Sequence, residues 1–118
     1  MTPGGARADR LAALYVAFNA RRLDVVLEHL SDDVDWQNAW EGGRLHGRDA
    51  VRDYWTRQWI EIDPAVRPRA FRTLADGRIA VDVHQTVRAL DGSLLGESDV
   101  SHVFAFEDDL ISRMDVES

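Results

Sequence analysis

His102 is the side chain in this sequence best suited to proton-transfer chemistry. It alternates with Phe104 and Phe106, so one strand is predicted to present all three side chains on the same face. An unperturbed imidazole titrates near neutral pH, which suits a general acid or base. A histidine among phenylalanines can equally be a hydrogen-bonded core residue. The pattern therefore leaves a catalytic and a structural role for His102 open.

A second group of polar side chains lies between Asp32 and Trp59, a stretch that holds all four tryptophans. Val34, Trp36 and Asn38 alternate as one strand face, and the stretch that follows has the spacing of a helix stripe. The two aromatic faces could form either a core or the walls of a pocket. In the pocket interpretation, the catalytic candidates are His102, Asn38 and Tyr15. The ligand-binding candidates are Phe18, Trp36, Trp40, Tyr54, Trp55, Trp59, Phe104 and Met114.

The remaining histidines are predicted to lie outside the pocket. His84 belongs to a polar strand face that is either solvated or part of a contact between two sheets. His46 is expected in the loop before the third helix, at the mouth of the pocket. His29 is expected on the surface of the second helix. Asp99 and Asp115 alternate away from the pocket face and are expected to be solvated or to face a partner chain.

Metal and cofactor sites are not expected. The four histidines lie on four different elements, and the sequence has no cysteine and no His-Glu-x-x-His pattern. Gly-rich phosphate loops and a nucleophile elbow are also absent from the sequence. We therefore predict no metal, no cofactor, no nucleotide hydrolysis and no serine hydrolase chemistry.

The elements that must position these residues form a helical half followed by strands. Helices are predicted over residues 6–21, 23–30 and 49–61, and strands over 34–38, 66–74, 78–90, 94–106 and 110–116. Asp76-Gly77 and Asp91-Gly92 are hairpin turns between alternating runs. Pro68 favours an edge strand. The segregated order predicts an α+β fold with helices on one face of an antiparallel meander, as a single domain over residues 1–118.

Composition restricts the classes of partner. The chain has 118 residues, 45% of them hydrophobic, and a formal net charge of −7. An acidic chain lacks the basic surface that nucleic-acid binding needs. No apolar run of about 18 residues could span a bilayer, and the first residues lack an apolar signal core. We expect a cytoplasmic protein without nucleic-acid or membrane partners.

Three segments carry a resemblance to a known family: FNARRLDVVLEHLSDDVDW, GRLHGRDAVRDYW and SHVFAFEDDLISRMD. Together with the order of elements, they resemble the nuclear transport factor 2-like superfamily, in its SnoaL-like (polyketide cyclase-like) and ketosteroid isomerase-like branches. The resemblance implies a cone, in which a strongly curved sheet wraps the helices and leaves a pocket. It also implies a homodimer formed through the sheet. We expect the outer face to carry Ser101, Val103 and Ala105, because an exposed face of that character would be unusual.

The resemblance is informative where residues depart from the isomerase branch. Asn38 stands at the position of that branch's catalytic Asp, and an amide cannot remove a proton from carbon. The oxyanion-hole Tyr matches Leu14, with Tyr15 one step away, and the second oxyanion acid matches His102. The Asp–Arg–Asp group of epoxide hydrolases with this fold cannot be assembled from inward positions. Classical ketosteroid isomerase chemistry is therefore not expected.

Three hypotheses of function remain. The first is a pocket protein that binds a small hydrophobic or aromatic ligand without a strong catalytic base. The second is an acid–base enzyme of the cyclase, isomerase, dehydratase or epoxide hydrolase type, which uses His102 with Asn38 or Tyr15. The third is a dimeric scaffold with an occluded core. Ligand identity and reaction type are not determined by the sequence.

Overall fold

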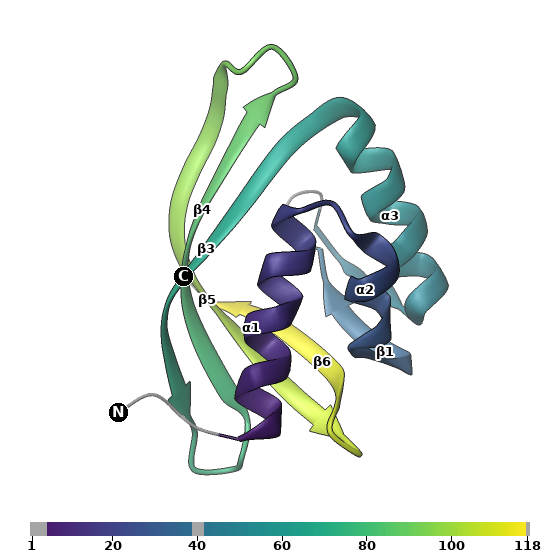
Figure 1. Cartoon of the computed structure of the whole chain (residues 1–118), viewed down its shortest axis with the longest axis vertical. Helices are drawn as coiled ribbons and strands as arrows, with labels where there is room; N and C mark the ends of the chain where they lie inside the picture. The colour runs from purple at the N-terminus through teal and green to yellow at the C-terminus, as the bar shows by residue number, and fades with distance from the viewer. Residues whose placement is uncertain (1–4, 39–41, 118) are drawn as a thin grey trace.

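The computed structural model of the protein describes residues 5–38 and 42–117. Helices α1, α2 and α3 span Ala6–Asn19, Leu23–Glu28 and Arg48–Glu61. The strands are β1 Leu30–Gln37, β2 Arg44–His46, β3 Ile62–Thr73, β4 Ile79–Ala89, β5 Leu94–Glu107 and β6 Leu110–Glu117. Figure 1 shows the helices gathered inside the curve of the sheet.

The described strands form one six-stranded mixed sheet in the order β2-β1-β6-β5-β4-β3. Strands β3 to β6 make the predicted antiparallel meander, and β1 then pairs with β6 in parallel. Gly77 and Gly92 have φ of 91° and 92°, a left-handed conformation that suits glycine in the two predicted Asp-Gly turns. β3 is an edge strand, as Pro68 predicts.

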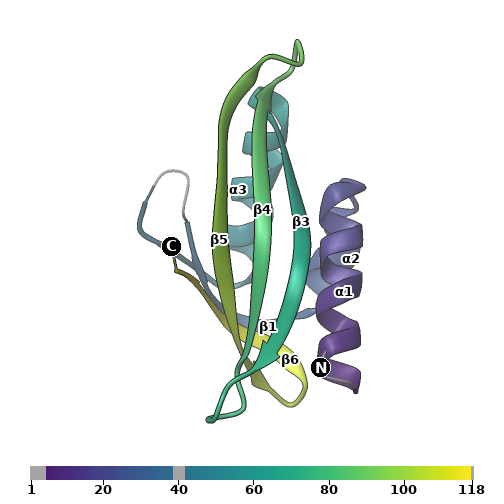
Figure 2. The same cartoon turned by 90° about the vertical axis from the view of Figure 1, so that its left-hand side faces the viewer.

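Irregular register accompanies the curvature of the sheet. The pairing shifts between Pro68 and Ala70, between Val87 and Arg88, and between Ala105 and Phe106. Such shifts bend strands and strengthen their twist. The concave face meets the helices, whereas no helix lies in front of β4 and β5 in Figure 2. The predicted α+β cone is confirmed.

The core joins α1 to the concave face of the sheet. The predicted inward residues of α1 are all buried: Leu11, Leu14, Tyr15 and Phe18. They pack in one cluster with Val34, Val81 and Phe104 from the sheet. On α3 the buried positions are Val51, Tyr54 and Gln58, so the fully buried line of α3 runs beside Trp55 and Trp59, which are half-buried. The fully buried face of α3 is therefore narrower than the apolar spacing of its sequence predicts.

Several predicted boundaries were wrong. The second helix ends at Glu28, and Leu30 instead begins β1, where it pairs with Ile111. β3 begins at Ile62, directly after α3, because Ile62 pairs with Ala89. Pro64 fits within this strand because an edge strand has one side without sheet partners. The short strand β2 was not predicted, since a three-residue strand leaves little periodic signal.

Three predicted surroundings also need correction. His46 lies in β2, not in a loop, and its side chain is exposed. His29 follows α2 and is half-buried, with its Nδ1 3.0 Å from Arg10 Nη1. On the outer face, Val103 is buried and Ser101 and Ala105 are half-buried in the single chain. Val103 is therefore not exposed in the single chain, as an open apolar surface would require.

Candidate functional site

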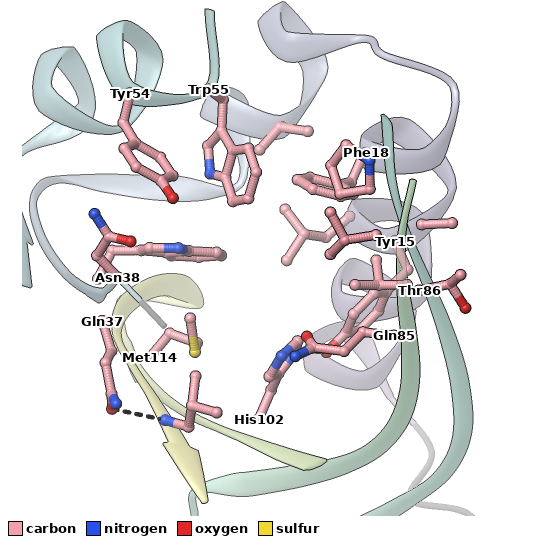
Figure 3. A pocket seen from close by; sticks show the side chains of 18 of the residues that line it. Tyr15, Phe18, Gln37, Asn38, Tyr54, Trp55, Gln85, Thr86, His102 and Met114 are labelled. Atoms are coloured by element: carbon pink, nitrogen blue, oxygen red, sulfur yellow. Dashed lines mark hydrogen bonds between the residues drawn. The ribbon is translucent and has the colours of Figure 1, made fainter. Parts of the chain in front are cut away.

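A cavity lies between the helices and the concave face of the sheet, with a volume of about 120 Å³. Figure 3 shows Tyr54, Trp55 and Asn38 on one side, and Tyr15, Gln85 and His102 on the other. Residues of all three helices and of strands β1, β3, β4, β5 and β6 line the cavity. A space of this size is comparable to the roughly 150 Å³ apolar cavity that binds benzene in another protein.

Tyr15 and His102 form a polar contact in the cavity wall. The phenol oxygen of Tyr15 lies 2.7 Å from Nδ1 of His102, and both side chains are buried. Their rings are nearly parallel, at 7°, with centroids 5.9 Å apart. Phe104 meets each ring edge-on. Packing thus fixes both partners, and the contact joins α1 to β5.

Burial keeps both members of this pair uncharged at neutral pH. Desolvation lowers the pKa of His102 to about 4, because the imidazolium loses its hydration. Desolvation likewise raises the pKa of Tyr15 well above its ordinary value. The direction of the hydrogen bond depends on the His102 tautomer. A neutral imidazole and a neutral phenol can each both donate and accept a proton.

Aromatic rings make up the apolar wall. Phe18 and Trp55 pack edge-on with centroids 4.7 Å apart, and Tyr54 lies 4.9 Å from Trp55. Trp36 packs against Phe104 across the space between β1 and β5. Offset and edge-on contacts of this kind hold rings in fixed orientations. The aromatic part of the wall is therefore held in a fixed arrangement.

Polar atoms lie at separate points along this wall. Asn38 is 7% exposed and directly follows β1, where its backbone N–H donates to the carbonyl of Gly43 over 2.9 Å. The Gln37 side-chain oxygen accepts a hydrogen bond from the backbone of Val116. The indole Nε1 of Trp55 is buried, and no described residue accepts its hydrogen. In Figure 3 this nitrogen lies on the side of the ring that faces Tyr54 and the cavity.

Most of the predicted site residues line the cavity. Tyr15, Asn38 and His102 do so, together with Phe18, Trp36, Tyr54, Trp55, Phe104 and Met114. Trp40 lies outside the described residues. Trp59 is not part of the lining, because its ring packs on Phe18 and Trp55 and under the Arg21 guanidinium. Asn38 lies across the cavity from His102, so Tyr15 and not Asn38 orients the imidazole.

Sequence reasoning missed the contribution of β3 and β4. Pro64, Ala65 and Val66 line the cavity from β3, and Gln85, Thr86 and Val87 line it from β4. Gln85 shares a strand face with Val81 and Val83, both buried, and a polar residue on an apolar face was a usable signal. No sequence pattern indicated that β3 lines the cavity, because its position there depends on the curvature of the sheet.

Charged side chains are placed away from the cavity. Among the described residues, the lining contains no Asp, Glu, Lys or Arg. The charges instead pair elsewhere, as in Arg44, which contacts Asp35 at 2.5 Å and Asp115 at 2.9 Å. Within the described ranges, no group of three His, Asp or Glu side chains could hold a metal ion. The cavity therefore matches an uncharged molecule with a few hydrogen-bonding atoms.

The cone-shaped sheet around three helices defines an α+β protein of the nuclear transport factor 2-like class. Residues 11–114 match the family described as SnoaL-like domain, and the chain belongs to this family. A comparison with curated protein sequences gives no significant match. No helix in the described part of the chain is long and apolar enough to cross a membrane.

Solved structures share this fold along nearly the whole chain. One is an NTF2-like protein of unknown function from Burkholderia pseudomallei, with 25% identity, a TM-score of 0.84, and 97% of this chain and 91% of that chain covered. TerC co-crystallised with polyporic acid has 21% identity, a TM-score of 0.82 and coverage of 95% and 90%. An LEH-like epoxide hydrolase from M. tuberculosis has 19% identity, a TM-score of 0.80 and coverage of 94% and 80%.

Proposed function

We propose that this protein binds a small, uncharged aromatic molecule in the cavity of its cone. The observation that carries the proposal is a cavity of about 120 Å³ whose described lining is aromatic and aliphatic, without a charged side chain. Burying a charge there would cost several kcal/mol, because no opposite charge is present to compensate it. Polar atoms of Asn38, Trp55 and His102 would then orient the oxygen or nitrogen atoms of the ligand.

The size of the cavity favours one aromatic ring with a short substituent in the enclosed part. Drug-sized ligands usually occupy about 300–1,000 Å³, well above this volume. TerC has been crystallised with polyporic acid. That complex supports the proposal of an aromatic ligand for a protein of this fold. The smaller size of the ligand proposed here follows from the cavity volume of this chain.

Binding can be tested with two ligands of similar shape and different charge. We expect acetophenone to quench the fluorescence of Trp36 and Trp55, which line the cavity, with saturation in the micromolar to millimolar range. Benzoate should bind at least about tenfold more weakly, a difference of about 1.4 kcal/mol. Thr56→Ala, on the exposed face of α3, should leave both affinities unchanged. Equal or tighter binding of benzoate would contradict the proposal.

A second candidate function is acid–base catalysis on such a ligand. The specific observation in its favour is the 2.7 Å contact between Tyr15 and His102 in the cavity wall. An epoxide hydrolase mechanism with an Asp–Arg–Asp group is not supported, because the described lining contains neither Asp nor Arg. Proton transfer at a carbonyl compound suits the pair better.

A further inference from the structure

Tyr15 and His102 share two hydrogens, and the positions of these hydrogens decide what the cavity offers to a ligand. Burial keeps both side chains uncharged at neutral pH, so the imidazole carries one N–H and the phenol one O–H. In one arrangement, the Tyr15 hydroxyl donates to Nδ1 of His102, and Nε2 carries the imidazole hydrogen. In the other, Nδ1 donates to the Tyr15 oxygen, and Nε2 is a bare acceptor. The two arrangements therefore present opposite hydrogen-bonding groups at Nε2.

The length of the contact favours the hydroxyl as the donor. The Tyr15 oxygen lies 2.7 Å from Nδ1 of His102. Hydroxyl donors most often give lengths of about 2.7–2.8 Å, whereas N–H donors to oxygen most often give about 2.9–3.0 Å. The chemistry of the two groups agrees, because a bare imidazole nitrogen is a much stronger base than a phenol oxygen.

The available hydrogen-bond partners favour the same arrangement. Tyr15 is 3% exposed, and His102 is its one side-chain hydrogen-bond partner among the described residues. If Nδ1 donated to the Tyr15 oxygen, the hydroxyl hydrogen would be a buried donor without an acceptor in the described protein, which is unfavourable. If the hydroxyl donates instead, its hydrogen and Nδ1 are both paired.

The second nitrogen of His102 lies on the other side of the ring, because the two imidazole nitrogens point in nearly opposite directions. No described residue forms a hydrogen bond with Nε2, and this atom keeps accessible surface. His102 lines the cavity (Figure 3), whose described lining contains no charged side chain. The Nε2–H is therefore an uncharged donor that a ligand in the cavity can reach.

We propose that Tyr15 fixes the tautomer of His102, and that the resulting Nε2–H makes the cavity select uncharged ring compounds that carry a hydrogen-bond acceptor. Tyr15 is then a positioning residue, because it acts on the ligand through His102. A ring nitrogen or a carbonyl oxygen accepts the Nε2–H, whereas a compound whose polar atom is an N–H meets a second donor. The selection rests on the proposed binding function, because the ligand must occupy the cavity. The tautomer is a property of the protein without a ligand.

A purely structural role for the Tyr15 hydroxyl would have different consequences. A hydroxyl that only joins α1 to β5 stabilises the fold, and its removal would change the affinities of different ligands alike. A hydroxyl that fixes the tautomer changes the ratio between the affinities of an acceptor and a donor, because it decides which of them Nε2 can pair with. The ratio of affinities and the protonation of each ring nitrogen therefore distinguish the two roles.

The first experiment measures the tautomer in the full chain without a ligand. Long-range ¹H–¹⁵N correlations distinguish a protonated from a bare ring nitrogen, and the His102→Gln spectrum identifies the signals of His102 among the four histidines. Between about pH 6 and 8, we expect Nε2 to be protonated and Nδ1 to be bare. In Tyr15→Phe the two nitrogens should become more alike, because no partner fixes the hydrogen. A protonated Nδ1 in the wild type would overturn the proposal.

The second experiment compares pyridine, whose nitrogen accepts a hydrogen bond, with pyrrole, whose N–H donates one, and uses benzene as a reference. At about pH 8 both probes and His102 are uncharged. Chemical-shift titration should show pyridine binding about tenfold or more tightly than pyrrole. The preference should fall to about threefold or less in Tyr15→Phe and in His102→Gln, whose amide offers both a donor and an acceptor. Val16→Ala, at the exposed neighbour of Tyr15 on α1, should keep the wild-type preference.

The outcomes separate the selection from the binding function. Binding of all three rings without a preference for pyridine would overturn the selection and leave the binding function standing. Failure of all three to bind would overturn the binding function and with it the selected class of ligand. A Tyr15→Phe variant with the wild-type spectrum and the wild-type preference would overturn the role of Tyr15. If a variant does not fold, the wild-type protein still decides, because a bare Nε2 or a preference for pyrrole contradicts the proposal.

Discussion

At the scale of single residues, the surroundings of a histidine decide its pKa, and two histidines of this chain are shifted in opposite directions. His102 is a histidine that does not titrate near neutrality, because burial against Phe104 and Tyr15 removes the hydration of its charged form. His84, on the convex face, shows the opposite behaviour. Its Nδ1 lies 2.7 Å from Asp99 and its Nε2 lies 2.6 Å from Glu97, and these carboxylates raise its pKa. The two histidines therefore contribute to stability in different pH ranges.

The lowered pKa of His102 predicts acid destabilisation. Between pH 6.5 and about 4, the unfolded chain binds a proton that folded His102 does not, so the free energy of unfolding falls as pH falls. The loss across this window should be about 3 kcal/mol. His102→Gln should remove this part of the pH dependence in urea unfolding curves. A variant with an unchanged slope below pH 6.5 would show that His102 is not buried as a neutral group.

His84 supplies a control with the opposite sign. Its folded-state pKa is raised, so its contribution is present below pH 6.5 and is lost as pH rises through the raised pKa. His84→Gln should therefore remove the loss of stability that occurs as pH rises above 6.5. The same unfolding measurements distinguish the two windows. An effect of His84→Gln confined to the acidic side would contradict this assignment.

Trp36 and Asn38 are two positions apart in the chain and are expected to respond differently to substitution. Trp36→Ala removes a ring that is 9% exposed and should cost about 3–5 kcal/mol of stability. Asn38→Leu replaces a buried amide by an apolar side chain, so it should cost about 1–3 kcal/mol while weakening acetophenone binding about tenfold. Thermal unfolding and fluorescence titration measure the two effects. Unchanged affinity in Asn38→Leu would remove Asn38 from the proposed site.

At the scale of elements, the end of α1 holds the edge strand that lines the cavity. The Asn19 side chain donates to the Val66 carbonyl over 2.7 Å and accepts from the Val66 N–H over 2.9 Å, as a neighbouring strand would. Arg21 donates to the Pro64 carbonyl at 2.6 Å, pairs with Asp63 and packs over Trp59. These contacts cover part of the free edge of β3.

Because Arg21 contacts Pro64, Asp63 and Trp59, its substitution should destabilise the protein far more than substitution of Arg22. Arg21→Ala should lower the free energy of unfolding by about 1.5–3 kcal/mol, because it removes hydrogen bonds from a charged donor. Arg22 is largely exposed and lies 3.9 Å from Asp24, so Arg22→Ala should change stability by less than about 0.5 kcal/mol. Denaturant unfolding compares the two variants. Equal losses would show that the contacts of Arg21 do not stabilise the junction between α1 and β3.

At the scale of the whole molecule, the sheet has one face covered by helices and one face free. The convex face of β4 and β5 carries no helix (Figure 2). Near its β1–β6 side, Asp35, Arg44, Arg113 and Asp115 form a closed set of ion pairs. A two-fold dimer uses the same patch on both subunits, and the convex face is the sheet surface that no helix covers.

We predict a homodimer through this face. Sedimentation at micromolar concentration should give twice the mass of one chain, because a stable interface needs about 800 Å² from each partner and the sheet offers a broad surface. Ala105→Arg should favour the monomer, since Ala105 pairs with Arg113 and a further positive charge there would be buried. Ala12→Arg, on the exposed side of α1, should leave the mass unchanged. A wild-type monomer would contradict the prediction.

The sequence by itself determined the order of elements except β2, the two Asp-Gly hairpins and most of the aromatic residues around the cavity. These features depend on local periodicity and on turn residues, which act over a few positions. Tertiary structure alone decided that Trp59 packs against Phe18, that β3 begins at Ile62, and that Tyr15 contacts His102, 87 positions further along the chain. It also decided the protonation state of that pair. Such facts depend on the curvature of the sheet and on burial, and neither is a property of a short stretch of chain.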